Sequence, residues 1–228
     1  MQGLYLVTPN WDDTDRLLAV TEQALRAGAH PGTHGRNSIA LLQYRHKHAD
    51  PSLRLAQATA LLALCRRHGV PCIINDVVDL AEAIGADGVH LGGTDESVAA
   101  VRARLGPAAI IGASCYGSVA RAVAAQDAGA SYVAIGGFYP SLVKKYDFVT
   151  APEIVQDARA VIRVPVVIIG GMTPQNAAPL VARGADMVAA ITSVYAAADT
   201  APGSPANGAE NVAQAVHAFA ALFSGRVG

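Results

Sequence analysis

Charged residues and cysteines are scarce in this sequence. Only 15% of its 228 residues are charged, the formal net charge is -1 and no basic run occurs, so nothing predicts electrostatic binding to nucleic acid. The three cysteines, Cys65, Cys72 and Cys115, match no metal-site or disulfide spacing and stand in apolar surroundings. We therefore expect reduced thiols in a cytoplasmic protein.

Long apolar runs are also missing. No segment approaches the ~20 apolar residues that a membrane-spanning helix requires. The N-terminal residues lead directly into an apolar run at 4–8 without a basic stretch, so we expect neither a membrane span nor a signal peptide. Hydrophobic residues nevertheless make up 52% of the chain. This share predicts a large buried core, which is typical of an α/β enzyme.

The sequence is rich in short apolar runs, each followed by a segment with helical periodicity. The runs are 4–8, 40–44, 72–75, 88–91, 110–114, 132–135, 166–169 and 187–190. The helical segments are 15–27, 52–68, 77–84, 96–105, 119–128, 152–161, 175–182 and 214–223. Glycines that can adopt a left-handed helix cap follow several of them, namely Gly28, Gly69, Gly85, Gly129 and Gly184.

This repetition predicts the fold. Alternating strands and helices with similar Gly-Ala turns indicate a repeated β-α unit. Such a series favours a closed (β/α)8 TIM barrel over an open sheet, because no run has the charged pattern of an edge strand. We expect residues 1–228 to form a single domain of this kind.

Polar residues stand at the ends of the third and fourth runs. Asn75 and Asp76 end the third run, and Asp95 follows the fourth. Because the carboxyl ends of barrel strands meet at one mouth, the two carboxylates should lie close together. Such a pair predicts a hard divalent cation that holds a phosphate or pyrophosphate. The alternative is that each aspartate caps the helix that follows it.

The other strand ends carry groups suited to anions. The second run leads into Gln43, Arg45 and Lys47, which predict an anion clamp, although a solvated loop is the alternative. Ser114 ends the fifth run, where it offers a hydroxyl to the mouth or caps a helix. The segment 136–145 after the sixth run is long enough to fold over a ligand.

The seventh and eighth runs end in small residues. A Gly-Gly turn contains Gly171, and Ile191 and Thr192 follow the last run. Loops at these two positions form the usual phosphate site of a TIM barrel through backbone N–H groups.

Familiar catalytic arrangements are absent from the sequence, which contains no HExxH motif, no Ser-His-Asp order and no Cys-His pair. His90 lies within an apolar run and is better interpreted as a satisfied core residue than as a base. The predicted chemistry therefore needs little acid–base help. It requires a pyrophosphate leaving group that a metal ion and Lys or Arg neutralise.

Six motifs in order carry a family resemblance. They are QYRHK at 43–47, IND at 74–76, DGVHLGGTD at 87–95, IGASC at 111–115, YPSLVK at 139–144 and IGGMT at 169–173. Over nearly the whole chain, from Leu4 to about Tyr195, the sequence resembles thiamine-phosphate synthases, also called thiamine-phosphate pyrophosphorylases. The resemblance implies an enzyme that joins hydroxymethylpyrimidine pyrophosphate to hydroxyethylthiazole phosphate and releases thiamine monophosphate and pyrophosphate. It also implies a dissociative mechanism, in which pyrophosphate leaves before the thiazole nitrogen attacks.

Positions that match the family motifs receive implied roles. The pyrimidine pyrophosphate would be held by Gln43, Tyr44, Arg45, His46, Lys47, Asn75, Ser114 and Lys144, of which Lys144, Ser114 and Arg45 are the implied catalytic residues. The thiazole phosphate would be held by Ser141, Leu142, Val143, Gly171, Ile191 and Thr192. The implied cofactor is Mg²⁺, held by Asp76 and Asp95.

Three positions depart from the family pattern. His46 replaces a Glu or similar residue, and Gly93 replaces a Gln. Val143 replaces a second hydroxyl residue directly before Lys144. Val143 removes a side-chain donor near the thiazole site.

Three other functions are alternatives to the synthase. One is a related thiazole tautomerase or regulator that keeps the barrel without the synthase residues. Another is a different phosphate-binding barrel lyase or isomerase, and a third is a non-catalytic phosphometabolite sensor. The presence of Asp76, Asp95 and Lys144 favours the synthase. The expected partners are small-molecule substrates, with no nucleic acid and no membrane, and the sequence leaves open whether the protein forms a homo-oligomer.

Overall fold

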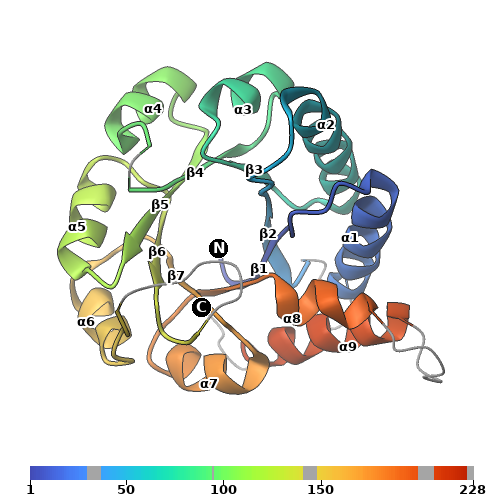
Figure 1. Ribbon diagram of the computed structural model, residues 1–228. Coiled ribbons are helices and arrows are strands. Elements are labelled where there is room, and N and C mark those ends of the chain that lie inside the picture. The colour runs from blue at the N-terminus through green and yellow to red at the C-terminus, as the bar shows by residue number, and fades with distance from the viewer. Residues whose placement is uncertain (30–36, 94, 141–147, 200–207, 225–228) are drawn as a thin grey trace.

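Eight parallel strands close into a barrel in the computed structural model, which describes residues 1–29, 37–93, 95–140, 148–199 and 208–224. The strands are β1 (Gly3–Val7), β2 (Ile39–Tyr44), β3 (Cys72–Asn75), β4 (Gly88–Leu91), β5 (Ile110–Tyr116), β6 (Tyr132–Gly136), β7 (Val166–Ile169) and β8 (Met187–Ala190). Each strand pairs with the next in chain order, and β8 pairs with β1 (Figure 1). This arrangement confirms the predicted (β/α)8 TIM barrel.

Helices surround the strands. They are α1 (Thr14–Gly28), α2 (Pro51–His68), α3 (Val78–Ile84), α4 (Val98–Leu105), α5 (Val119–Asp127), α6 (Ile154–Val161), α7 (Pro174–Ala182), α8 (Thr192–Tyr195), the 3₁₀ helix η2 (Ala196–Ala198) and α9 (Gly208–Ala221). The last helix, α9, packs against α1 and closes the ring (Figure 1). Within the described ranges, no helix has both the length and the apolar character needed to cross a membrane.

The predicted elements agree with the structure to within two residues at each end, except near the C-terminus. The runs 72–75, 88–91, 166–169 and 187–190 coincide with β3, β4, β7 and β8. The predicted last helix at 214–223 was wrong in its bounds, because α9 begins at Gly208 and ends at Ala221. The short helix α8 was not predicted, since its four residues are too few to show a helical period.

Most of the predicted glycine caps adopt the expected conformation. Gly69, Gly85, Gly129 and Gly184 all have positive φ. The prediction for Gly28 was wrong, because this residue is the last one of α1 and does not have positive φ. Its lack of a side chain serves close packing instead, since a β-carbon there would lie 2.0 Å from Oδ1 of Asn37.

Apolar side chains fill both sides of the strands. Residues such as Tyr5, Leu41 and Met187 point inward and form a core inside the barrel. Their neighbours along each strand, such as Leu42, point outward and pack against the helices. Burying each such aliphatic side chain contributes about 1.5–3 kcal/mol. Because this core fills the barrel interior, the functional groups are concentrated at its carboxyl end.

Candidate active site

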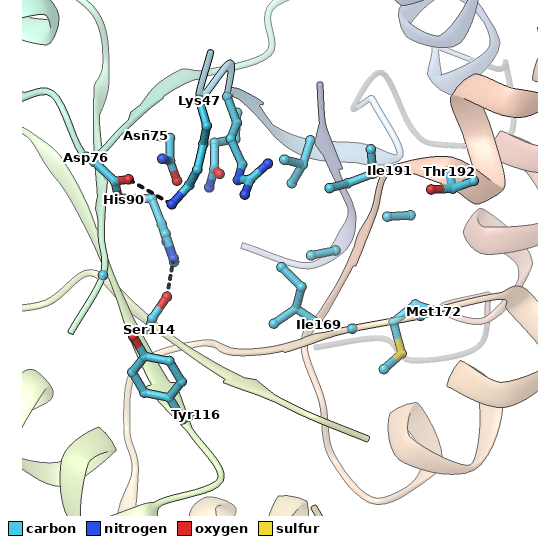
Figure 2. A pocket seen from close by; sticks show the side chains of 18 of the residues that line it. Lys47, Asn75, Asp76, His90, Ser114, Tyr116, Ile169, Met172, Ile191 and Thr192 are labelled. Carbon is cyan, nitrogen blue, oxygen red and sulfur yellow. Dashed lines mark hydrogen bonds and ion pairs between the residues drawn. The ribbon is translucent and has the colours of Figure 1, made fainter. Parts of the chain in front are cut away.

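A cavity of about 440 Å³ opens at the carboxyl ends of the strands (Figure 2). The structure brings ten of the predicted site residues to its wall. They are Gln43, Arg45, Lys47, Asn75, Asp76, Asp95, Ser114, Gly171, Ile191 and Thr192. The cavity is large enough for small molecules of metabolite size. The predicted lid residues Ser141, Leu142, Val143 and Lys144 lie outside the described residues.

Tyr44 does not reach this cavity. Side chains alternate along β2, so Gln43 points into the barrel while Tyr44 points toward α2. The Tyr44 hydroxyl donates to Oε1 of Gln57 at 3.0 Å, and the Tyr44 side chain is buried. It lines a separate hollow of about 160 Å³ instead.

His46 is also turned away from the large cavity. Its Nε2 lies 2.9 Å from Oδ1 of Asp12, and its Nδ1 accepts a backbone N–H bond from Ala49 at 3.0 Å. The His46 side chain thereby joins the loop after β1 to the loop after β2. It supports the loop that presents Arg45 and Lys47 and lines only the smaller hollow.

The loop after β1 fixes both cationic residues through their backbones. The Arg45 N–H donates to Oγ1 of Thr8 at 2.8 Å, and this hydroxyl donates back to the Arg45 carbonyl at 3.2 Å. The Lys47 N–H donates to Oδ1 of Asn10 at 3.1 Å. The long side chains of Arg45 and Lys47 then extend from a fixed backbone to the cavity, where they can meet an anion.

The carboxylates of Asp76 and Asp95 lie together at the ends of β3 and β4. Burial, followed by the neighbouring Asp95 carboxylate, raises the pKa of Asp76 above its ordinary value. Lys47 opposes this rise, since its Nζ lies 3.7 Å from Oδ2 of Asp76 (Figure 2). Two ionised carboxylates that lie this close together repel each other, and a cation bound between them would offset the repulsion.

The helices after these strands are capped by other residues. The first residue before α3 is Val77, which makes no side-chain cap bond. The helix α4 is capped by Ser97, whose Oγ accepts from the Ala100 N–H at 3.2 Å. The alternative that Asp76 and Asp95 are helix caps is therefore excluded.

The backbone around the carboxylates is unusual. Asp76 (φ 62°) and Tyr116 (φ 54°) are the described non-glycine residues with positive φ, and both line the cavity. A left-handed conformation costs such residues about 1–3 kcal/mol, and residues held in it cluster at active sites and ligand clamps. The Asp76 N–H donates to the His90 carbonyl at 2.9 Å, which holds the residue in place.

The turn after β7 forms the opposite wall. Gly170 and Gly171 have φ values of 109° and 62°, which side chains disfavour. Asn176 fixes the turn, because its Nδ2 donates to the Gly171 carbonyl at 2.9 Å. Ile191 and Thr192 face the turn from the start of α8, where the first backbone N–H groups have no partner within the helix. This wall can bind a phosphate through backbone N–H groups.

Two residues near the site, Tyr5 and Tyr132, were not predicted from the sequence. Tyr5 and Tyr132 point into the barrel, and their hydroxyls lie 2.6 Å apart. The Tyr132 hydroxyl also lies 3.0 Å from Nδ1 of His90. Nε2 of His90 lies 2.9 Å from Oγ of Ser114 (Figure 2). A signal existed, because a tyrosine at an inward position of a buried strand needs a partner for its hydroxyl.

Ser114 is available for binding. The helix that follows it, α5, is capped by Ser118, whose Oγ accepts from the Arg121 N–H at 3.3 Å. The alternative that Ser114 is a helix cap is thus excluded. His90 is bonded at both ring nitrogens, in agreement with its interpretation as a satisfied residue, but it also lines the cavity.

The mouth of this closed (β/α)8 barrel combines paired carboxylates, two cationic side chains and a glycine turn. These features define an enzyme that acts on phosphorylated small molecules. The model of the thiamine monophosphate synthase family matches residues 4–194. The chain belongs to this family.

Individual relatives agree with this assignment. A thiamine-phosphate synthase of Janthinobacterium sp. (strain Marseille) is 61% identical over 87% of this chain and 91% of its own length. One of Xanthomonas campestris is 50% identical over 87% of this chain and 90% of its own. The solved structure of a thiamine phosphate pyrophosphorylase from Pyrococcus furiosus is similar with a TM-score of 0.78 and 27% identity, over 100% of this chain and 98% of that one.

Proposed function

We propose that this protein condenses hydroxymethylpyrimidine pyrophosphate with hydroxyethylthiazole phosphate to give thiamine monophosphate and pyrophosphate. The observation that carries the proposal is the convergence of Arg45, Lys47, Asp76, Asp95 and Ser114 on one cavity. The names of the relatives support the same reaction. A tautomerase, regulator or sensor would not need this complete set of leaving-group residues.

Each half of the cavity suits one substrate. The pyrimidine pyrophosphate would bind Gln43, Arg45, Lys47, Asn75 and Ser114, which line one side. The thiazole phosphate would bind the opposite wall through Gly171, Ile191 and Thr192. On the family motif alone, we also assign Lys144 to the pyrimidine pyrophosphate and residues 141–143 to the thiazole phosphate. Tyr44 and His46 contribute to it only by holding the loop after β2.

Mg²⁺ is part of the proposal, and the donor set fits it. Asp76 and Asp95 supply two carboxylates, and Asn75 supplies an amide beside them. Among the described residues, no cluster of three or more His, Cys, Asp or Glu side chains occurs. Mg²⁺ suits this arrangement, because it commonly binds one or two carboxylates and takes its other ligands from water and phosphate oxygens. When bound, it would neutralise charge on the leaving pyrophosphate.

The side chains at the mouth support a dissociative route. Arg45 and Lys47 would hold the pyrophosphate oxygens as the carbon–oxygen bond breaks and negative charge accumulates there. The pyrimidine methylene then carries positive charge until the thiazole nitrogen attacks it. That nitrogen has no proton to lose, so the step needs no general base.

The direct experiment is incubation of the protein with both substrates and Mg²⁺, with thiamine monophosphate detected by mass spectrometry. Formation of product at a rate proportional to enzyme concentration would support the synthase. Binding of both phosphates without product would favour the sensor, and rearrangement of the thiazole substrate alone would favour the tautomerase. The Asp76→Asn variant is the matched control for contaminating activity.

Three broader statements are also proposals. Residues 1–228 form one domain, which the pairing of β1 with β8 supports. A cytoplasmic location is supported by the three cysteines, which are buried and free. Association into a homo-oligomer would be tested by light scattering.

A further inference from the structure

A chain of hydrogen bonds crosses the barrel interior and ends at the cavity. Nε2 of Gln43 lies 2.6 Å from the Tyr5 hydroxyl, which lies 2.6 Å from the Tyr132 hydroxyl. The Tyr132 hydroxyl lies 3.0 Å from Nδ1 of His90, and Nε2 of His90 lies 2.9 Å from Oγ of Ser114. The chain thus connects side chains from β2, β1, β6, β4 and β5.

The direction of this chain follows from proton counting. Each tyrosine hydroxyl has one proton to donate. The amide nitrogen of Gln43 can only donate, so the Tyr5 oxygen accepts there and the Tyr5 proton goes to Tyr132. Tyr132 accepts from Tyr5 and therefore donates to Nδ1 of His90. As long as the Gln43 amide nitrogen donates to Tyr5, the reverse direction at either tyrosine would leave a buried hydroxyl proton without an acceptor among the described residues, which is costly.

The surroundings keep these protons in place. Tyr5 and Tyr132 are 1% and 0% exposed, and burial raises the pKa of both hydroxyls well above the ordinary value. The His90 ring also stacks on the Tyr132 ring, with centroids 5.7 Å apart and planes inclined by 18°. The stacked ring has little freedom to turn away from its two partners.

A neutral histidine that accepts at Nδ1 carries its proton on Nε2. His90 then donates to Oγ of Ser114, and the Ser114 proton is left to donate into the cavity. We propose that Tyr5, Tyr132 and His90 are positioning residues that make the Ser114 hydroxyl a hydrogen-bond donor to the substrate. The recognised group is an acceptor without hydrogen, either a ring nitrogen or a phosphoryl oxygen. Its assignment to the pyrimidine pyrophosphate rests on the proposed function.

The opposite direction has a different signature. If Gln43 presented its oxygen to Tyr5, every bond in the chain would reverse. His90 would carry its proton on Nδ1, and Ser114 would donate to Nε2 of His90. The serine oxygen could then only accept from a ligand. The two arrangements therefore differ in which ring nitrogen of His90 is protonated.

The first experiment measures this tautomer in the ligand-free protein. Long-range ¹H–¹⁵N NMR on protein with ¹⁵N-labelled histidine distinguishes the two forms, and comparison with the His90→Gln variant assigns the signal. We expect a neutral ring protonated on Nε2. A ring protonated on Nδ1, or on both nitrogens, at pH 7.5 overturns the proposal. The measurement needs no substrate, so its outcome is independent of whether the protein makes thiamine monophosphate.

The second experiment links the chain to binding. Tyr132→Phe removes the donor to Nδ1 of His90, so we expect a mixture of tautomers and about a five- to tenfold fall in kcat/KM for the pyrimidine substrate, the scale of one lost hydrogen bond. The KM for the thiazole phosphate should not change.

Tyr195→Phe is the matched control. Tyr195 is also fully buried, but its hydroxyl bonds to Thr21 at 2.8 Å, outside the barrel interior. This variant should lose similar stability while keeping the His90 tautomer and the kinetics of the unmodified protein. Equal kinetics in Tyr132→Phe and Tyr195→Phe overturns the positioning role. If Tyr132→Phe does not fold, the tautomer of the unmodified protein still decides the proposal.

Discussion

Oδ1 of Asp76 and Oδ2 of Asp95 approach the same face of Gly92, at 3.8 and 2.7 Å from the position where a β-carbon would stand. The two carboxylates can meet because no side chain separates them. Burial, followed by the closeness of the Asp95 carboxylate, raises the pKa of Asp76, and the pair creates the site proposed for Mg²⁺.

The carboxylate pair should be essential for activity. We expect Asp76→Asn or Asp95→Asn to lower kcat/KM by about 100-fold or more, the scale of removing a major charge-stabilising group. Steady-state kinetics at several Mg²⁺ concentrations measures the loss. Asp79→Asn is the control, because Asp79 forms an exposed ion pair with Arg104 away from the cavity. Full activity in both site variants would exclude the proposed metal role.

The raised pKa of Asp76 predicts how stability depends on pH without metal. The folded state binds the Asp76 proton more tightly than the unfolded state does. The free energy of unfolding should therefore fall as pH rises from the ordinary aspartate pKa of 3.8 through the raised value. Asp76→Asn removes this loss, so its stability relative to the unmodified protein should increase over that range.

Denaturant unfolding in EDTA at a series of pH values measures this difference. Asparagine tolerates the left-handed backbone, so Asp76→Asn can also change stability by an amount that is the same at every pH. Only the part of the stability difference that varies with pH therefore tests the pKa shift. Added Mg²⁺ should stabilise the unmodified protein at neutral pH and have a smaller effect on Asp76→Asn. A stability difference that stays constant with pH would contradict the assigned pKa shift.

Gly171 should be needed for the thiazole-phosphate wall. A β-carbon there would lie 2.3 Å from the Pro140 carbonyl oxygen, and φ is 62°. We expect Gly171→Ala to raise the KM for the thiazole phosphate at least about tenfold and to destabilise the protein by ~1–3 kcal/mol. Gly69→Ala tests the backbone effect alone, since Gly69 has φ 64° and nothing within 4 Å of its β-position. Equal KM values in the two variants would remove Gly171 from the site.

Lys144 should be the functional lysine of the segment 136–145. Its distance in sequence from Tyr139 and Pro140 matches the family motif, whereas that of Lys145 does not. We expect Lys144→Ala to lower kcat more than it weakens thiazole phosphate binding, because the lysine acts on the leaving group. Lys145→Ala should be nearly silent in parallel assays. The reverse result would mean that the family motif is aligned wrongly in this segment, so the roles given to Ser141 and Val143 would be wrong as well.

A dissociative route predicts a strong substituent effect. Electron-withdrawing groups on the pyrimidine should slow turnover steeply, because they destabilise positive charge on the methylene carbon. Single-turnover rates across a substituted series measure this dependence. Rates that hardly change while chemistry limits turnover would indicate concerted displacement.

The sequence alone determined the order of the strands and placed their bounds to within two residues. Apolar runs such as those at 72–75 and 88–91 are local signals, and buried parallel strands produce them directly. The sequence also identified Asp76, Asp95, Arg45 and Lys47, since the ends of barrel strands must converge. The family motifs added the two substrates that we propose.

Tertiary structure decided what local signals do not contain. The outward direction of Tyr44 and the buried bonds of His46 depend on which face of β2 meets α2 and on the position of the loop after β1. The link from Gln43 through Tyr5 and Tyr132 to Ser114 joins residues up to 127 positions apart in the chain. Only closure of the barrel brings their hydroxyls within hydrogen-bonding distance, because a hydrogen bond acts over about 3 Å whereas a sequence pattern extends over neighbouring residues.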